Sequence, residues 1–126
     1  MAFIYKNPNP KNNLVGDCVI RAISIASGHD WDDVFLDLII TCYMLKDIPS
    51  SNSAWSTFLH NKGYQRRIIP DTCPDCYTIA DFAKDYPKGT YIVHTGTHVV
   101  AVIDGNYYDT WDSGNEIPIY YWKEEK

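Results

Sequence analysis

The sequence has no apolar run that approaches the ~20 residues needed to cross a bilayer, and its N-terminus lacks the apolar core of a signal peptide. These absences exclude a helical membrane protein and predict a cytoplasmic location with no membrane partner. Basic residues are also few, because 11 Lys and Arg stand against 16 Asp and Glu and leave a net charge of −5. That balance argues against a nucleic-acid partner.

Internal repeats, low-complexity tracts and long linkers are absent too, and cysteine occurs only four times. A chain of 126 residues has the usual length of one domain, so residues 1–126 are expected to share a single fold. An apolar content of 45% with 21% charged residues is that of an ordinary globular protein, not of a disordered one. In a reducing cytosol the cysteines are expected to stay thiols.

Helical spacing of apolar residues dominates the first half of the chain. The opening segment 1–13 contains Asn-Pro-Asn-Pro, which disfavours helix, and is expected to be an irregular arm. Three helices are predicted after it: one from Asp17 to a stop at Gly28, one that starts at Asp30, and one that follows residues 50–53 and stops at Gly63.

The second half is rich in β-branched and aromatic residues. A short strand is predicted at 67–69 and a short helix at 79–86, followed by strands at 90–94, 97–103, 106–111 and 117–122. Asp104-Gly105, between the middle two, is the dipeptide that a two-residue type I′ hairpin prefers. Helices first and antiparallel strands after them indicate an α+β fold.

Cys18 stands at the first turn of the first predicted helix, directly after Gly16-Asp17. Unpaired N–H groups and the helix dipole at such a position can lower a thiol pKa from ~8.5 toward the 3.5–7.5 range of reactive cysteines. A thiolate nucleophile also needs an imidazole that accepts and returns a proton. Taken alone, Cys18 fits a small buried residue better than a nucleophile, and a catalytic role requires a histidine beside it.

His98 is the candidate, and the two-residue turn at Asp104-Gly105 shows which carboxylate lies beside it, because the turn sets the register of its two strands. In this register Val100 lies opposite Asp109, so His98 and Asp109 share one face of the sheet while Asp112 points to the other. We therefore expect Asp109 to orient the His98 imidazole. A hydrogen-bonded strand histidine and a solvated carboxylate are the structural alternatives. With Cys18, these residues would form a nucleophile, a base and an orienting carboxylate.

Three segments carry a resemblance to a known family: GDCVIRA at 16–22, THVVAV at 97–102 and YDTW at 108–111. Together they resemble the papain-like cysteine peptidase superfamily, and within it small phage and bacterial proteins akin to the bacteriocin-leader-processing peptidases. The resemblance implies a nucleophile helix packed on a C-terminal antiparallel sheet, with Cys18 as nucleophile, His98 as base and Asp109 as the orienting residue. It also implies the host cytoplasm if a phage encodes the chain.

The same resemblance draws attention to Asn12. The family places an oxyanion-hole side chain, typically Gln, six residues before the nucleophile, and Asn12 occupies that place here. The shorter amide can still donate one hydrogen bond to a developing oxyanion beside the Cys18 backbone N–H. An ordinary turn at residues 11–13 is the alternative.

Other residues compete for chemical roles. His94 is a second candidate base, but no following strand brings a carboxylate beside it. Arg21, three residues after Cys18, is better explained by a salt bridge than by ligand binding. Cys73 and Cys76 form a single CxxC, and a structural zinc site usually takes two such pairs, so a loop with two thiols is the preferred interpretation.

The sequence thus predicts a cysteine-dependent hydrolase, a peptidase or isopeptidase, that acts on a peptide or protein substrate without a cofactor or a metal. Three alternatives stay open: a thiol deamidase or transamidase, a non-catalytic papain-like binding module, and a redox or metal protein that uses the CxxC.

Overall fold

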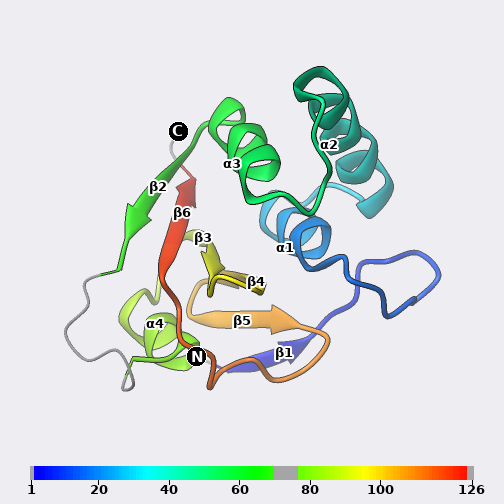
Figure 1. The fold of residues 1–126 in the computed structure, drawn as a ribbon. Coiled ribbons are helices and arrows are strands. Elements are labelled where there is room, and N and C mark those ends of the chain that lie inside the picture. The colour runs from blue at the N-terminus through cyan, green and yellow to red at the C-terminus, as the bar shows by residue number, and fades with distance from the viewer. Residues whose placement is uncertain (1, 70–76, 125–126) are drawn as a thin grey trace.

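A computed structural model describes residues 2–69 and 77–124 (Figure 1). Within them three consecutive helices follow the first strand, and residues 6–17 and 110–119 form connections without helix or strand. In chain order the elements are β1 (Phe3–Tyr5), α1 (Cys18–Ser27), α2 (Trp31–Leu45), α3 (Asn52–Asn61), β2 (Tyr64–Ile68), α4 (Ile79–Asp85), β3 (Thr90–His94), β4 (Val99–Ile103), β5 (Asn106–Asp109) and β6 (Tyr120–Glu124).

The strands form one six-stranded sheet in the order β1-β5-β4-β3-β6-β2. Every neighbouring pair is antiparallel except β1 and β5, which run parallel. The α+β prediction is confirmed, but the sheet is mixed and not wholly antiparallel, and the arm at 1–13 is not wholly irregular. Three residues of that arm complete the sheet on the open edge of β5, a segment too short to show the alternation that identifies a strand.

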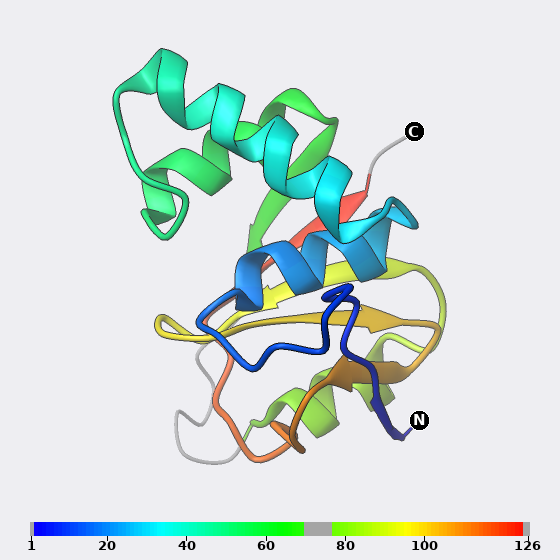
Figure 2. The same ribbon diagram turned by 90° about the vertical axis from the view of Figure 1, so that its right-hand side faces the viewer.

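Helices cover both faces of the sheet (Figures 1 and 2). The helices α1, α2 and α3 lie over one face, where α1 crosses β4, and α4 lies under the other. The strand β4 contributes to both cores, since Val99 and Ala101 pack toward α1 while Val100 and Val102 pack toward α4. Burial on both faces explains why β4 is a continuous apolar run instead of an alternating one.

The hairpin between β4 and β5 has the predicted register. Ile103 pairs with Asn106, and the two turn residues Asp104 and Gly105 both have positive φ, as a type I′ turn requires. Within the hairpin, β4 begins at Val99 and not at residue 97, and β5 ends at Asp109 and not at residue 111. Two other strands also begin elsewhere than expected. The strand β2 starts at Tyr64 and is exposed along most of its length, so it lacks an apolar pattern, and β6 starts only after Pro118, which has no N–H to donate.

Among the described residues, no helix has the length and the apolar character needed to span a bilayer. The longest, α2, has 15 residues and packs through one side only: Leu38 is fully buried, whereas Leu36 on the outer side is 59% exposed.

These two leucines test the packing of the helical layer. We expect Leu38→Ala to lower the free energy of unfolding by about 2–5 kcal/mol, because it leaves a cavity beneath α2. Leu36→Ala makes the same change on the same helix but at an exposed position, and should cost less than about 0.5 kcal/mol. Urea denaturation of both variants measures the difference, and equal losses would contradict this packing of α2.

Candidate active site

Cys18 is the first residue of α1, and its thiol is partly buried where the helix start meets the sheet. Burial alone would raise the pKa of this thiol. Hydrogen bonds from the His98 ring and from the Val99 backbone N–H, together with the positive charges of His98 and Arg21, outweigh it and hold the pKa below its ordinary value. The structure therefore favours a thiolate at Cys18.

His98 lies just before β4 and is oriented by groups on both sides. Its Nε2 lies 2.6 Å from Oδ2 of Asp109, which leaves Nδ1 as the ring nitrogen that faces Cys18. Its ring also packs against Trp111, with the ring centroids 5.0 Å apart. Burial disfavours the charged ring, but the hydrogen bonds and charges of Asp109 and Cys18 outweigh it and raise the pKa of His98 to about 9. The imidazole is therefore held as an imidazolium at neutral pH.

Asp109, at the end of β5, is the buried anchor of this arrangement. Besides the His98 ring, its carboxylate accepts hydrogen bonds from the Ser113 hydroxyl at 2.7 Å and the Thr110 backbone N–H at 2.8 Å, and Nη2 of Arg21 lies 3.5 Å away. Burial would raise the pKa of Asp109, but these hydrogen bonds and the positive charge of His98 lower it. The Asp109 carboxylate is therefore ionised over the pH range in which His98 is an imidazolium.

The structure brings Cys18, His98 and Asp109 together from the helix start, the beginning of β4 and the end of β5. Asp112 lies elsewhere, with its carboxylate accepting a hydrogen bond from the Tyr107 hydroxyl at 2.7 Å. The side-chain alternation along the hairpin thus identified the carboxylate that contacts the imidazole. A thiol, an imidazole and a buried carboxylate in this order can generate a nucleophile and transfer its proton.

Asn12 is not brought to this cluster. Its side chain is exposed, its backbone has a φ of 55°, and it does not line the cavity that borders Cys18. Its N–H closes a turn with the carbonyl of Asn9 at 2.9 Å. The oxyanion role of Asn12 stays a prediction with no contact to support it. The N–H groups at the start of α1 are alternative donors, since the first hydrogen bond of that helix runs from the N–H of Arg21 to the carbonyl of Asp17.

His94, the competing base, is buried and neutral. Only 3% of it is exposed, and its ring packs between Trp55 and Tyr120. Burial and the nearby positive charges of Arg66 and His98 lower the pKa of His94 to about 4. Its Nδ1 has no hydrogen-bond partner within the part of the chain that the structure describes. The geometry therefore favours His98 as the proton carrier.

A groove borders Cys18 between the helical layer and the β3–β4 turn. This cavity of about 830 Å³ lies among the start of α1, the N-terminal ends of α2 and α3, and the turn at 95–98. Its lining is mainly apolar and aromatic, with side chains that include those of Val15, Trp31, Phe35, Trp55 and His94. A cavity of this size and lining has the character of a ligand-binding site.

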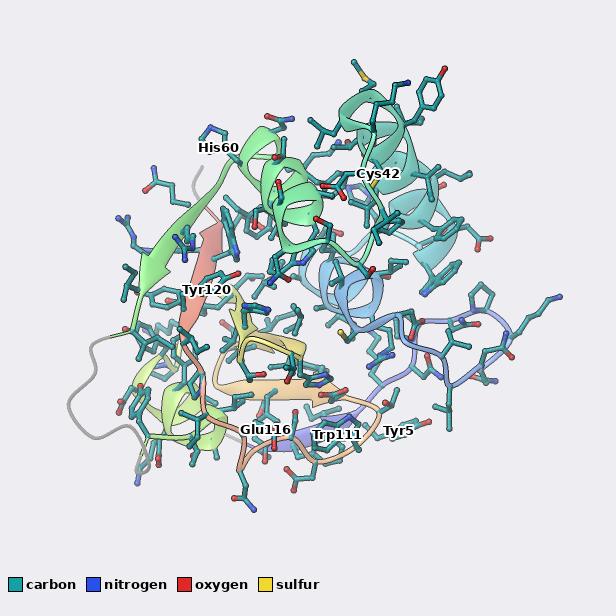
Figure 3. The ribbon with its side chains drawn as sticks, viewed as in Figure 1. Tyr5, Cys42, His60, Trp111, Glu116 and Tyr120 are labelled. Carbon is teal, nitrogen blue, oxygen red and sulfur yellow. The ribbon has the colours of Figure 1, made fainter. Side chains whose placement is uncertain are left out.

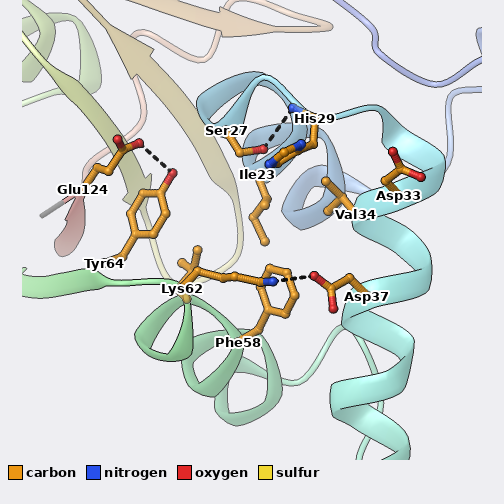
Figure 4. Close-up of a pocket in the computed structure, with 11 residues that line it drawn as sticks. Ile23, Ser27, His29, Asp33, Val34, Asp37, Phe58, Lys62, Tyr64 and Glu124 are labelled. Carbon is orange, nitrogen blue, oxygen red and sulfur yellow. Dashed lines mark hydrogen bonds and ion pairs between the residues drawn. The ribbon is translucent and has the colours of Figure 1, made fainter. Parts of the chain in front are cut away.

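A second cavity, of about 510 Å³, lies at the opposite end of α1 (Figure 4). An ion pair of 2.7 Å between Lys62 and Asp37 crosses its rim, and none of Cys18, His98 and Asp109 lines it. Cys73 and Cys76 lie outside the described residues. Within residues 2–69 and 77–124, His, Cys, Asp and Glu side chains do not gather into a group that could hold a metal ion.

Sequence reasoning missed Ser113 and the full part played by Arg21. Ser113 lies four residues after Asp109, is fully buried, and donates a hydrogen bond to the Asp109 carboxylate. No sequence motif indicated this contact. The salt bridge expected of Arg21 is present, but it reaches two carboxylates, those of Asp17 and Asp109.

No protein-family model matches this chain, and no curated protein or solved structure matches it.

Ser113 tests the burial of the Asp109 carboxylate. Because the Asp109 pKa is lowered on folding, its contacts stabilise the protein above the ordinary value of 3.8, and this stability is lost as the pH falls through the folded value. We expect Ser113→Ala to cost about 1–3 kcal/mol at neutral pH, and distinctly less once the pH is low enough to protonate Asp109 in the folded protein. Ser53→Ala, at an exposed position, is the control. A cost that does not change with pH, measured by urea denaturation, would contradict the role of Ser113.

Proposed function

We propose that this protein is a cysteine-dependent hydrolase of amide bonds, a peptidase or isopeptidase, in which Cys18 is the nucleophile. One observation carries the proposal: the Cys18 thiol is hydrogen-bonded to His98, whose other ring nitrogen lies 2.6 Å from the buried Asp109 carboxylate. The lowered pKa of the thiol and the raised pKa of the imidazole support a thiolate–imidazolium pair at neutral pH.

Acylation follows from this pair. The Cys18 thiolate attacks the amide carbonyl carbon, a C–S bond forms, and the carbonyl electron pair moves onto oxygen. His98 then gives its Nδ1 proton to the leaving nitrogen as the C–N bond breaks, which releases an amine and leaves a thioester on Cys18. Asp109 holds the ring in the required orientation and stabilises its charged form.

Hydrolysis of the thioester regenerates the pair. A water molecule gives a proton to the neutral His98 as its oxygen attacks the thioester carbonyl carbon. Collapse of this second tetrahedral intermediate breaks the C–S bond, returns the electron pair to sulfur and releases a carboxylic acid. The sum is an amide and water converted to an acid and an amine, with Cys18 and His98 back in their starting charge states.

The oxyanion would be stabilised at the start of α1. The N–H groups of Cys18, Val19 and Ile20 precede the first helical hydrogen bond and lie at the positive end of the helix dipole. Donors placed where charge develops are usually worth about 10²–10³ in rate each. The apolar groove beside Cys18 suits a peptide or protein chain as the substrate.

A papain-like architecture agrees with the position of the nucleophile at the start of a helix packed across the sheet that holds the base. A reducing compartment such as the cytoplasm would keep the Cys18 thiol available.

The rate of Cys18 alkylation by iodoacetamide against pH tests the pair without a known substrate. Mass spectrometry localises the adduct. We expect fast alkylation that persists well below pH 8, and in His98→Ala a fall of about tenfold or more near pH 6, because that variant removes the hydrogen bond and the charge that lower the thiol pKa.

Two controls accompany this measurement. His60→Ala removes an exposed imidazole on α3 and should leave the profile unchanged. Cys42 is a thiol in the same chain, buried in the helical layer with a raised pKa, and should react slowly throughout (Figure 3). A Cys18 that alkylates only near its ordinary pKa and ignores the loss of His98 would refute the proposed hydrolase and leave a binding module.

Acyl transfer itself is tested with p-nitrophenyl acetate, an activated ester that needs no specific recognition. We expect a burst of nitrophenol and an acetyl group on Cys18, both lost in Cys18→Ala and slowed in Asp109→Asn, which disturbs the His98 ring. A wild-type protein that alkylates rapidly but never acquires the acetyl group would show a reactive thiol without acyl-transfer activity.

A further inference from the structure

The N-cap residue of α1 does not cap its helix. Asp17 occupies a position at which a carboxylate ordinarily accepts hydrogen bonds from the second or third N–H group of the helix. Here its side chain makes no such bond. Both oxygens are engaged elsewhere: Oδ1 pairs with the Arg21 guanidinium, and Oδ2 accepts a hydrogen bond of 2.9 Å from the indole N–H of Trp31.

Arg21 makes contacts with three parts of the site. Besides Asp17, its guanidinium lies 3.5 Å from Oδ1 of Asp109 and donates to the carbonyl of Val15 at 3.4 Å. The side chain is 8% exposed, and the two carboxylates beside it are at least as well buried. A planar guanidinium can donate to several acceptors at once. The ammonium group of lysine is a compact point charge and binds fewer of them.

The position of the Asp17 carboxylate matters for acyl transfer. Turned onto the helix start, it would occupy the N–H groups that the oxyanion requires and place a negative charge beside the sulfur and the developing oxygen. Arg21 and Trp31 hold both of its oxygens in other hydrogen bonds, so those N–H groups stay free for substrate.

We propose that Arg21 is a positioning residue of the site: it binds the Asp17 carboxylate, with the help of Trp31, so that the start of α1 stays open to the oxyanion, and it ties that helix start to Asp109. This inference rests on the proposed acyl-transfer function. It assigns the buried arginine a part in the reaction that goes beyond a salt bridge in the core.

Two reagents separate this role from a general effect on the thiol. Alkylation by iodoacetamide displaces iodide at a saturated carbon and forms no oxyanion, whereas acetylation by p-nitrophenyl acetate passes through a tetrahedral oxyanion. The ratio of the acetylation rate to the alkylation rate of Cys18 therefore falls when stabilisation of the oxyanion is lost. Thiolate content affects both rates and largely cancels.

We expect Arg21→Met to lower this ratio about tenfold or more, because the released Asp17 carboxylate can turn onto the helix start. Removing that carboxylate as well, in Arg21→Met with Asp17→Ala, should restore most of the ratio. Arg21→Lys should give an intermediate value, since one ammonium serves fewer acceptors. Arg67→Met makes the same change at an exposed position on β2 and should leave the ratio unchanged.

A purely structural role predicts something different. If Arg21 only stabilises the core, the rate ratio in the double variant is no higher than in Arg21→Met. That result, or an Arg21→Met ratio equal to that of the wild type, overturns the proposal. If Arg21→Met does not fold, the same rate ratio is measured in Trp31→Phe. It removes the hydrogen bond to Asp17 but keeps an aromatic ring against Phe35. A fall in its ratio that Asp17→Ala restores supports the proposal, and an unchanged ratio overturns it.

The wild-type protein keeps the two proposals apart. A wild-type Cys18 that is neither alkylated at low pH nor acetylated refutes the hydrolase itself, and the role of Arg21 with it. A reactive wild type whose ratio is insensitive to Arg21 and Trp31 refutes only the positioning role.

Discussion

The carboxylate of Asp109 is almost completely removed from water, and the site is organised by the need to satisfy it. A buried carboxylate is tolerated only when hydrogen bonds and positive charges replace its hydration. Asp109 obtains them from separate parts of the chain: the imidazole of His98, the hydroxyl of Ser113, the N–H of Thr110 and the guanidinium of Arg21. The contacts that keep Asp109 ionised therefore also orient the imidazole of His98 and, through Arg21, link α1 to the sheet.

Charge alternates through the buried cluster. The carboxylate of Asp17, the guanidinium of Arg21, the carboxylate of Asp109, the imidazolium of His98 and the sulfur of Cys18 each face a group of opposite sign. A weakened link in such a network affects its neighbours, because charges interact more strongly where water is excluded. Stability, thiol reactivity and oxyanion binding are thus expected to respond together, and only measurements that separate them assign a role to one residue.

Much of this arrangement could be read from local sequence. The helix over 18–27 with its stop at Gly28, and the hairpin at Asp104-Gly105, depend on short-range physics, and the alternation of side chains along the hairpin selected Asp109 over Asp112. Elements with weak local signals were missed or displaced. The strand β1 has three residues and exists because β5 offers a free edge, and β2 is largely exposed, so neither shows a clear apolar pattern.

By itself, the sequence determined a helix that begins at Cys18 and a hairpin that places His98 beside Asp109, because both follow from backbone preferences over a few residues. Only the tertiary structure decided that the helix start lies over that hairpin, that Asn12 stays outside the cluster, and that Arg21 joins Asp17 to Asp109. The reason is physical. Packing and burial act between segments that are distant in the chain. Which polar and charged groups become buried, and so require hydrogen bonds or opposite charges, is set only when those segments pack together.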